Sequence, residues 1–245
     1  MSRERFVVSG EIDLVRVRGL LFDVDGTLSD TDDAYVDRIS RLLKPAARLF
    51  RDRNPNKFAR WLVMAIESPA NFFYNLSDRL GLDRSFLRVY TWLSQRFRTE
   101  KPNHNRFRLI PGTREMLAVL SRHYPLAVVS ARDAQSTRHF LEFFNLTQYF
   151  EVIVTAQTCR YTKPFADPVL WAAEQLGLAP EACVMIGDTI VDIQAGKAAN
   201  AQTIGVLCGF GVERELKRAG ADLILLRTPD ILEVFLMSET STEDV

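Results

Sequence analysis

The sequence predicts a doubly wound parallel α/β sheet whose first strand is followed by a long helical insertion. After residue 107, short apolar runs alternate with longer amphipathic stretches, as strands alternate with the helices that cover them. The runs are apolar at nearly every position, which is typical of parallel strands buried on both faces. One more such run precedes residue 30, and no convincing strand pattern lies between the two parts. We therefore expect an α/β core domain at 1–30 and 108–245, and an all-helical cap domain at 31–107.

The strands and helices of the core follow from the apolar pattern in chain order. The first strand is the run GLLFDV near residue 20. Later helices are predicted from apolar residues at helical spacing, and Gly177 and Gly220 stand where helix C-caps are expected. Residues 1–17 are left unassigned, as an extra strand or an arm. The later strands are predicted at 126–130, 152–155, 183–188, 203–208 and 223–226, and the helices at 113–123, 133–145, 166–177, 192–200 and 212–220.

The insertion differs from the core in both pattern and charge. Four amphipathic segments within residues 31–107 indicate successive helices. The insertion contains 15 Lys and Arg residues against 8 Asp and Glu residues. This positive surplus belongs either to solvated helix faces or to contacts with an anionic substrate, and the sequence leaves both open.

The bulk composition is that of a soluble globular protein. Hydrophobic residues make up 47% of the chain, charged residues 25%, and the formal net charge is zero, so no nucleic-acid partner is indicated. No apolar run approaches the ~20 residues that span a bilayer, and no signal peptide is recognisable, so no membrane partner is expected. Cys159, Cys183 and Cys208 show no CxxC spacing. We predict a cytoplasmic protein with reduced thiols; the oligomeric state has no sequence signal.

Two aspartates close the first predicted strand. Asp23 and Asp25 stand one residue apart at the end of an apolar run. Two carboxylates that lose water at such a position repel each other and cost free energy unless they are paired. A bound cation would remove the conflict, although a simple acidic turn after a strand is the structural alternative.

Other polar residues stand where further strands end. Ser130 ends the run LAVVS, Asp188 follows CVMIG, and Asp192 comes one helical turn later. Lys163 lies in a loop after the run VIVT. The carboxyl ends of parallel strands meet at one edge of a sheet, so these side chains are expected to converge with the two aspartates. Oxygen donors without a His or Cys cluster suit a hard cation such as Mg²⁺.

Taken together, four short segments resemble a known family. DVDGTLSDT, VVS, KP and GDTIVD, in this order, are similar to the motifs of the haloacid dehalogenase-like hydrolase superfamily, in its helical-cap, phosphoglycolate phosphatase-like branch. The resemblance covers about residues 18 to 235. It implies a Rossmann-like core, an inserted cap, Mg²⁺ as cofactor and a small phosphorylated metabolite as substrate.

The resemblance also implies a role for each residue. Asp23 would be the nucleophile that forms an aspartyl-phosphate, and Asp25 the general acid and base. Mg²⁺ would be held by Asp23, by the backbone carbonyl of Asp25 and by Asp188, with Asp192 orienting this group or Lys163. The phosphoryl oxygens would be bound by Ser130, by the backbone at Ala131 and by Lys163.

The expected function is a Mg²⁺-dependent phosphatase that hydrolyses a small soluble phosphomonoester. The acid at position 25 argues against dehalogenation and against C–P cleavage, because relatives with those activities lack it. Two alternatives stay open, a phosphosugar mutase of the same superfamily and a non-catalytic phosphate-binding module. One departure concerns the turn after Ser130, where the chain has Ala131 and Arg132 instead of the expected Asn or Gly.

Overall fold

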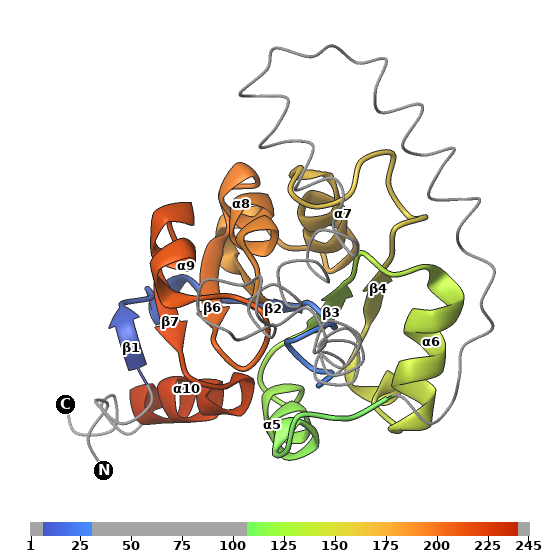
Figure 1. Ribbon diagram of the computed structural model, residues 1–245, viewed down its shortest axis with the longest axis horizontal. Helices are drawn as coiled ribbons and strands as arrows, with labels where there is room; N and C mark the ends of the chain where they lie inside the picture. Colours follow the sequence, from blue (N-terminus) through green and yellow to red (C-terminus); the bar gives the residue numbers. More distant parts are fainter. Residues whose placement is uncertain (1–6, 31–106, 240–245) are drawn as a thin grey trace, which may run out of the picture. The chain divides into compact units, whose positions relative to one another are not determined.

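The computed structural model describes residues 7–30 and 107–239. Within them, seven strands form one sheet in the order β1-β7-β6-β5-β2-β3-β4 (Figure 1). Every neighbouring pair is parallel except β1 with β7. The predicted doubly wound α/β core is therefore confirmed. The strands are β1 (Val7–Gly10), β2 (Gly19–Phe22), β3 (Leu126–Val129), β4 (Val152–Val154), β5 (Cys183–Gly187), β6 (Gln202–Val206) and β7 (Leu223–Leu225).

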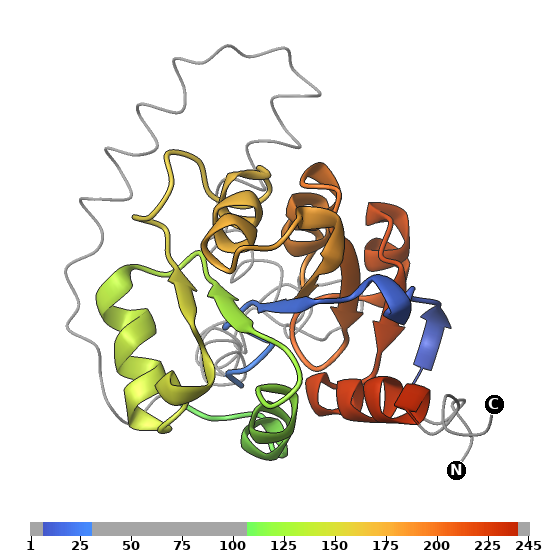
Figure 2. The same ribbon diagram turned by 180° about the vertical axis from the view of Figure 1, so that it is seen from behind.

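Helices cover both faces of the sheet (Figure 1 and Figure 2). Side chains alternate along β2, so Leu20 and Phe22 enter the hydrophobic cluster under α5, α6 and α10, whereas Leu21 enters the cluster under α7 and α8. Leu216 of α9 packs with Ile193 of α8 on that second face. The helices are α5 (Thr113–Leu120), α6 (Ala134–Phe143), α7 (Asp167–Gln175), α8 (Ile190–Ala198), α9 (Glu213–Ala219) and α10 (Ile231–Glu239).

The helix ends agree with the predicted stop signals. Gly220 is the C-cap of α9 in the left-handed conformation, with φ of 91°, and Gly177 has φ of 68° just after α7. Glycine adopts such conformations without the steric cost that a β-carbon brings. Short 3₁₀ segments, which the sequence did not predict, are η2 (Leu14–Arg16), η5 (Thr147–Tyr149), η6 (Pro180–Ala182) and η7 (Thr228–Asp230).

The unassigned N-terminal segment supplies the edge of the sheet. β1 pairs antiparallel with β7, and Gly10 sits so close to it that a β-carbon there would be 2.0 Å from the carbonyl oxygen of Asp222. Of the two options for residues 1–17, the extra strand is therefore correct for residues 7–10. Within the described part of the chain, no helix is long and apolar enough to cross a membrane.

The backbone divides into two compact units, residues 1–32 with 107–245, and residues 33–106. The segment for which an all-helical cap is predicted lies almost entirely outside the described residues. The cap, its helices and its basic surface therefore stay predictions.

Candidate active site

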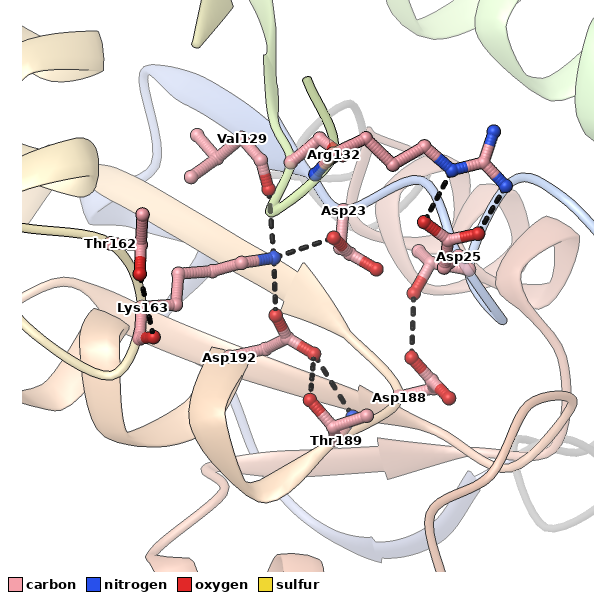
Figure 3. A network of polar contacts seen from close by, with 11 residues as sticks. Asp23, Asp25, Val129, Arg132, Thr162, Lys163, Asp188, Thr189 and Asp192 are labelled. Carbon is pink, nitrogen blue, oxygen red and sulfur yellow. Dashed lines mark hydrogen bonds and ion pairs between the residues drawn. The ribbon is translucent and has the colours of Figure 1, made fainter. Parts of the chain in front are cut away.

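Three neighbouring strands at the centre of the sheet end in the predicted site residues. β2 lies between β5 and β3, and these strands are directly followed by Asp23, Asp188 and Ser130, respectively. All three side chains are buried. The parallel strand order thus places residues far apart in sequence at one edge of the sheet, as predicted. Figure 3 shows the side chains around this edge.

Lys163 connects two of the carboxylates. Its ammonium nitrogen lies 2.5 Å from Asp23 Oδ1 and 2.6 Å from Asp192 Oδ1, and it donates a hydrogen bond of 2.8 Å to the carbonyl oxygen of Val129 (Figure 3). Only 3% of the Lys163 side chain is exposed. Burial acts to lower the pKa of Lys163, but Asp192 and Asp23 outweigh it and raise the pKa above its usual range. Lys163 is therefore a permanently charged, buried cation.

The pKa of Asp23 is shifted far above its ordinary value. Burial raises its pKa from 3.8 to about 7, Lys163 acts in the opposite direction, and Asp192 and Asp25 add to the rise. A carboxylate in this setting needs more positive charge than one ammonium to be fully ionised near neutral pH. One oxygen of Asp23 faces Lys163, and the other points away from it (Figure 3).

Asp188 is held by a loop that the sequence analysis did not single out. The backbone N–H of Phe210, in the loop after β6, donates to Asp188 Oδ2 at 2.7 Å, and the Thr27 hydroxyl lies 3.4 Å from Oδ1. A β-carbon at Gly26 or Gly209 would lie 2.3 or 2.1 Å from Asp188 Oδ2. The backbone therefore packs directly against this carboxylate. The signal in the sequence was the glycine-rich stretch CGFG at 208–211.

Asp192 is engaged by its own helix as well as by Lys163. Its Oδ2 accepts hydrogen bonds from the backbone N–H of Thr189 at 3.0 Å and from the Thr189 hydroxyl at 2.6 Å, which forms a capping box at the start of α8. Its Oδ1 faces Lys163. Both of its oxygens are thus used to fix α8 and the lysine, which supports the predicted orienting role.

The acidic side chains of this site suit a hard cation. Within the described residues, Asp23, Asp188 and Asp192 each offer an oxygen, and these atoms lie within 4.8 Å of one another. The cluster holds three buried carboxylates, and Lys163 is ion-paired with only two of them, Asp23 and Asp192, so the cluster has more acidic groups than this one ammonium group can offset. A divalent ion with oxygen ligands would offset this excess, and the residues present fit such an ion.

Arg132 is a site residue that the sequence analysis did not assign. Its guanidinium group makes a two-point ion pair with the carboxylate of Asp25 (Figure 3). The backbone N–H of Arg132 donates to Ser130 Oγ at 3.1 Å, so this hydroxyl also shapes the turn after β3. Ala131, at the tip of that turn, is exposed. The signal for Arg132 was the departure AR at 131–132.

The sequence between β2 and β6 matches a known family. Residues 20–206 match the family described as haloacid dehalogenase-like hydrolase. The chain belongs to this family. The predicted resemblance is confirmed, and so is the prediction that the protein is a hydrolase of the phosphatase type.

Curated relatives of this hydrolase cover nearly its whole length. It is 29% identical over 219 residues to a phosphoglycolate phosphatase of Nitrosococcus oceani, a match that covers 84% of this chain and 91% of that protein. It is 28% identical over 219 residues to the pyrophosphatase PpaX of Oceanobacillus iheyensis, with 89% and 96% covered.

Solved structures agree with the fold. A haloacid dehalogenase-like family hydrolase from Streptococcus pneumoniae has a TM-score of 0.65 at 22% identity, covering 90% of this chain and 99% of that one. A hydrolase from Pseudomonas syringae has a TM-score of 0.63 at 25% identity, covering 90% and 98%.

Proposed function

We propose that this family member is a Mg²⁺-dependent phosphatase that hydrolyses a small phosphomonoester through a phosphorylated Asp23. The observation that carries the proposal is the set of charged groups around the Asp23 carboxylate. This carboxylate follows the central strand, is bound by the buried Lys163 at 2.5 Å, and has a second acid, Asp25, two residues away. Nucleophile, charge-neutralising cation and proton carrier thus stand together in one site.

The first step transfers the phosphoryl group to the protein. An Asp23 oxygen forms a bond to phosphorus, and the bond between phosphorus and the ester oxygen breaks. Asp25 gives its proton to the departing oxygen, so the product leaves as a neutral alcohol. Lys163 stays charged throughout and offsets negative charge on Asp23 and on the phosphoryl oxygens.

The second step returns Asp23 to its starting state. A water molecule attacks phosphorus, the bond to Asp23 breaks, and Asp25 accepts the proton of that water. Inorganic phosphate leaves. Ser130 and the exposed backbone at Ala131 lie at the turn after β3, where they would bind phosphoryl oxygens.

The cation would be held by Asp23, Asp188 and the backbone carbonyl of Asp25. When bound, it supplies positive charge that offsets the meeting of phosphate and carboxylate and favours ionised Asp23. The chain's own contribution is to keep these ligands in place. The Phe210 N–H and the close approach of Gly26 and Gly209 fix Asp188, while Asp192 fixes Lys163.

We further propose a phosphoglycolate-like substrate, a short phosphomonoester whose alcohol carries a carboxylate. The support is the name shared by the relatives from Nitrosococcus oceani and Aquifex aeolicus, which are both phosphoglycolate phosphatases. The predicted basic surplus of residues 31–107 would favour such an anionic compound.

Phosphate release from a panel of phosphorylated metabolites tests the proposal. Each compound is assayed with Mg²⁺, with chelator, and with the variant Asp23→Asn. Asp222→Asn is a matched control, because Asp222 is a partly exposed acid paired with Lys197 away from the site. Metal-dependent release by the wild type and by Asp222→Asn, and loss of release in Asp23→Asn, would support the proposal.

Two other results would point elsewhere. Isomerisation of a sugar phosphate without release of phosphate would indicate the mutase alternative. Mg²⁺-dependent binding of phosphate compounds without any turnover would indicate the phosphate-binding module. Either result would refute hydrolysis as the main activity.

A further inference from the structure

Arg132 binds the carboxylate of Asp25, which the proposed mechanism needs as proton carrier. Arg132 Nε lies 2.5 Å from Asp25 Oδ2, and Nη2 contacts Oδ1, so both carboxylate oxygens accept from one guanidinium group. Only 14% of the Arg132 side chain and 27% of the Asp25 side chain are exposed. Two-point pairs of this kind are stronger than single charged hydrogen bonds and fix the orientation of the carboxylate.

The guanidinium end of this pair is fixed by its surroundings. The rings of Phe107 and Phe140 each lie 5.5 Å from the Arg132 guanidinium carbon, and Phe140 is fully buried in α6. The backbone of Arg132 is held by Ser130 Oγ. If one partner moves, it is therefore the shorter, more exposed Asp25 side chain, and Arg132 stays in place.

The paired state and the working state of Asp25 exclude each other. To protonate a leaving group, a carboxyl oxygen must carry the proton and face the substrate, whereas here both oxygens face Arg132. Release of Asp25 would leave a permanently charged, largely buried guanidinium group without its carboxylate, which is costly. A second anion at the same place would remove that cost.

We propose that Arg132 exchanges the carboxylate of Asp25 for an anionic group on the alcohol part of the substrate. The inference rests on the proposed function and deepens it, because it assigns Arg132 as the residue that recognises the second anion of the substrate. Binding of that anion frees Asp25, which takes up a proton from water and can then give it to the departing oxygen. Arg132 is then a specificity-determining residue that couples substrate recognition to the release of the acid.

A pair of substrates of equal length tests the exchange. 2-Phosphoglycolate carries a carboxylate where 2-hydroxyethyl phosphate carries a neutral hydroxymethyl group. We expect the wild type to show a kcat/KM at least about tenfold higher for the charged compound. Arg132→Gln should lose most of this preference, through a fall for phosphoglycolate and a rise for the neutral ester, because Asp25 is then no longer held in the ion pair. Arg138→Gln, which removes an exposed arginine from α6, the helix that follows Arg132, should keep the preference.

Equal kcat/KM values of the wild type for the two esters would overturn the inference. So would an equal fall for both in Arg132→Gln, which would indicate a merely structural role. Arg132→Lys keeps the charge and the stem, and it provides a folded variant if the glutamine variant is unstable. It should retain part of the preference, because a lysine cannot form the two-point contact.

Two further arms separate this inference from the proposed function. p-Nitrophenyl phosphate has a leaving group that needs little protonation, so Mg²⁺-dependent release of nitrophenolate tests hydrolysis without requiring the exchange. In the Asp23→Asn background, calorimetry compares the affinities for the same two esters with and without Arg132→Gln. If the wild type releases nitrophenolate but does not distinguish 2-phosphoglycolate from 2-hydroxyethyl phosphate, the exchange at Arg132 is refuted and the phosphatase proposal stands. If the Asp23→Asn protein binds the two esters with different affinities but the wild type hydrolyses neither ester nor p-nitrophenyl phosphate, the phosphatase proposal is refuted and the anion recognition by Arg132 stands.

Discussion

Replacement of Lys163 with methionine removes a buried ammonium group and keeps the apolar stem. In the folded protein this ammonium lies 2.5 Å from Asp23 and 2.6 Å from Asp192, whose side chains are 7% and 1% exposed. Loss of one partner of a buried ion pair costs about 3–5 kcal/mol, because the remaining charge stays out of water. The lost hydrogen bond to the Val129 carbonyl adds about 1 kcal/mol. Protonation of a carboxylate reduces the cost at low pH.

The expected result at pH 8 is a fall in the free energy of unfolding of the metal-free core by about 4–6 kcal/mol, the sum of the two effects. Lys197→Met is the matched control, because Lys197 and Asp222 form a pair whose side chains are 37% and 29% exposed. Such a pair contributes about 0–1 kcal/mol. The comparison therefore isolates the effect of burial on the same substitution.

Urea denaturation measures both variants. Trp61 and Trp92 are replaced with Phe in every sample, so that the fluorescence of Trp171, which lies in α7 and packs against the core, reports the unfolding of the core. The slopes with urea should agree among the proteins, so that the midpoints report stability. If Lys163→Met were destabilised by no more than Lys197→Met, the view of Lys163 as the neutralising cation of the site would be refuted.

Three other changes test separate parts of the structure. Gly209→Ala places a β-carbon 2.1 Å from Asp188 Oδ2, so Mg²⁺ affinity measured by calorimetry should fall about 10–100-fold. The control Gly177→Ala, whose β-carbon has nothing within 4 Å, should lower stability and leave the Mg²⁺ affinity unchanged. Equal Mg²⁺ affinities of the two variants would contradict the role given to the loop after β6. We expect Mg²⁺ to raise the melting temperature of the wild type. Asp188→Asn should abolish this rise, whereas the control Asp222→Asn should show it in full. A full rise in Asp188→Asn would exclude Asp188 as a metal ligand. Burial raises the pKa of Cys183 from 9.0 to about 11, so the folded state binds more protons than the unfolded state between pH 9.0 and about 11, and the thiol's contribution to stability is lost as pH rises through this range. The difference in the free energy of unfolding between wild type and Cys183→Ala should therefore shrink over the same range. A constant difference would refute the raised pKa of Cys183.

The sequence predicted the core well because its signals are local and redundant. Strands buried on both faces give continuous apolar runs, and six runs predicted β2 to β7 to within one or two residues at each end. The convergence of Asp23, Ser130 and Asp188 followed from one rule of parallel sheets. The edge strand β1 could only be left open between a strand and an arm, because VVSG is short and half-exposed and its pairing with β7 is set by the fold as a whole.

Side-chain partners across the site were beyond the reach of the sequence pattern. The residues that hold Asp188, including Phe210 and Gly209, act through backbone atoms and close approach, for which residue type gives little warning. Arg132 is different, because it appeared as a departure from the family motif and the structure gives that departure a partner. A guanidinium group at the turn after β3 can bind an acid that the chemistry requires to move. The position at which this chain departs from the family motif is thus the position that carries the proposed exchange, since a guanidinium group that binds the carboxylate of Asp25 at two points can bind a substrate carboxylate in the same way.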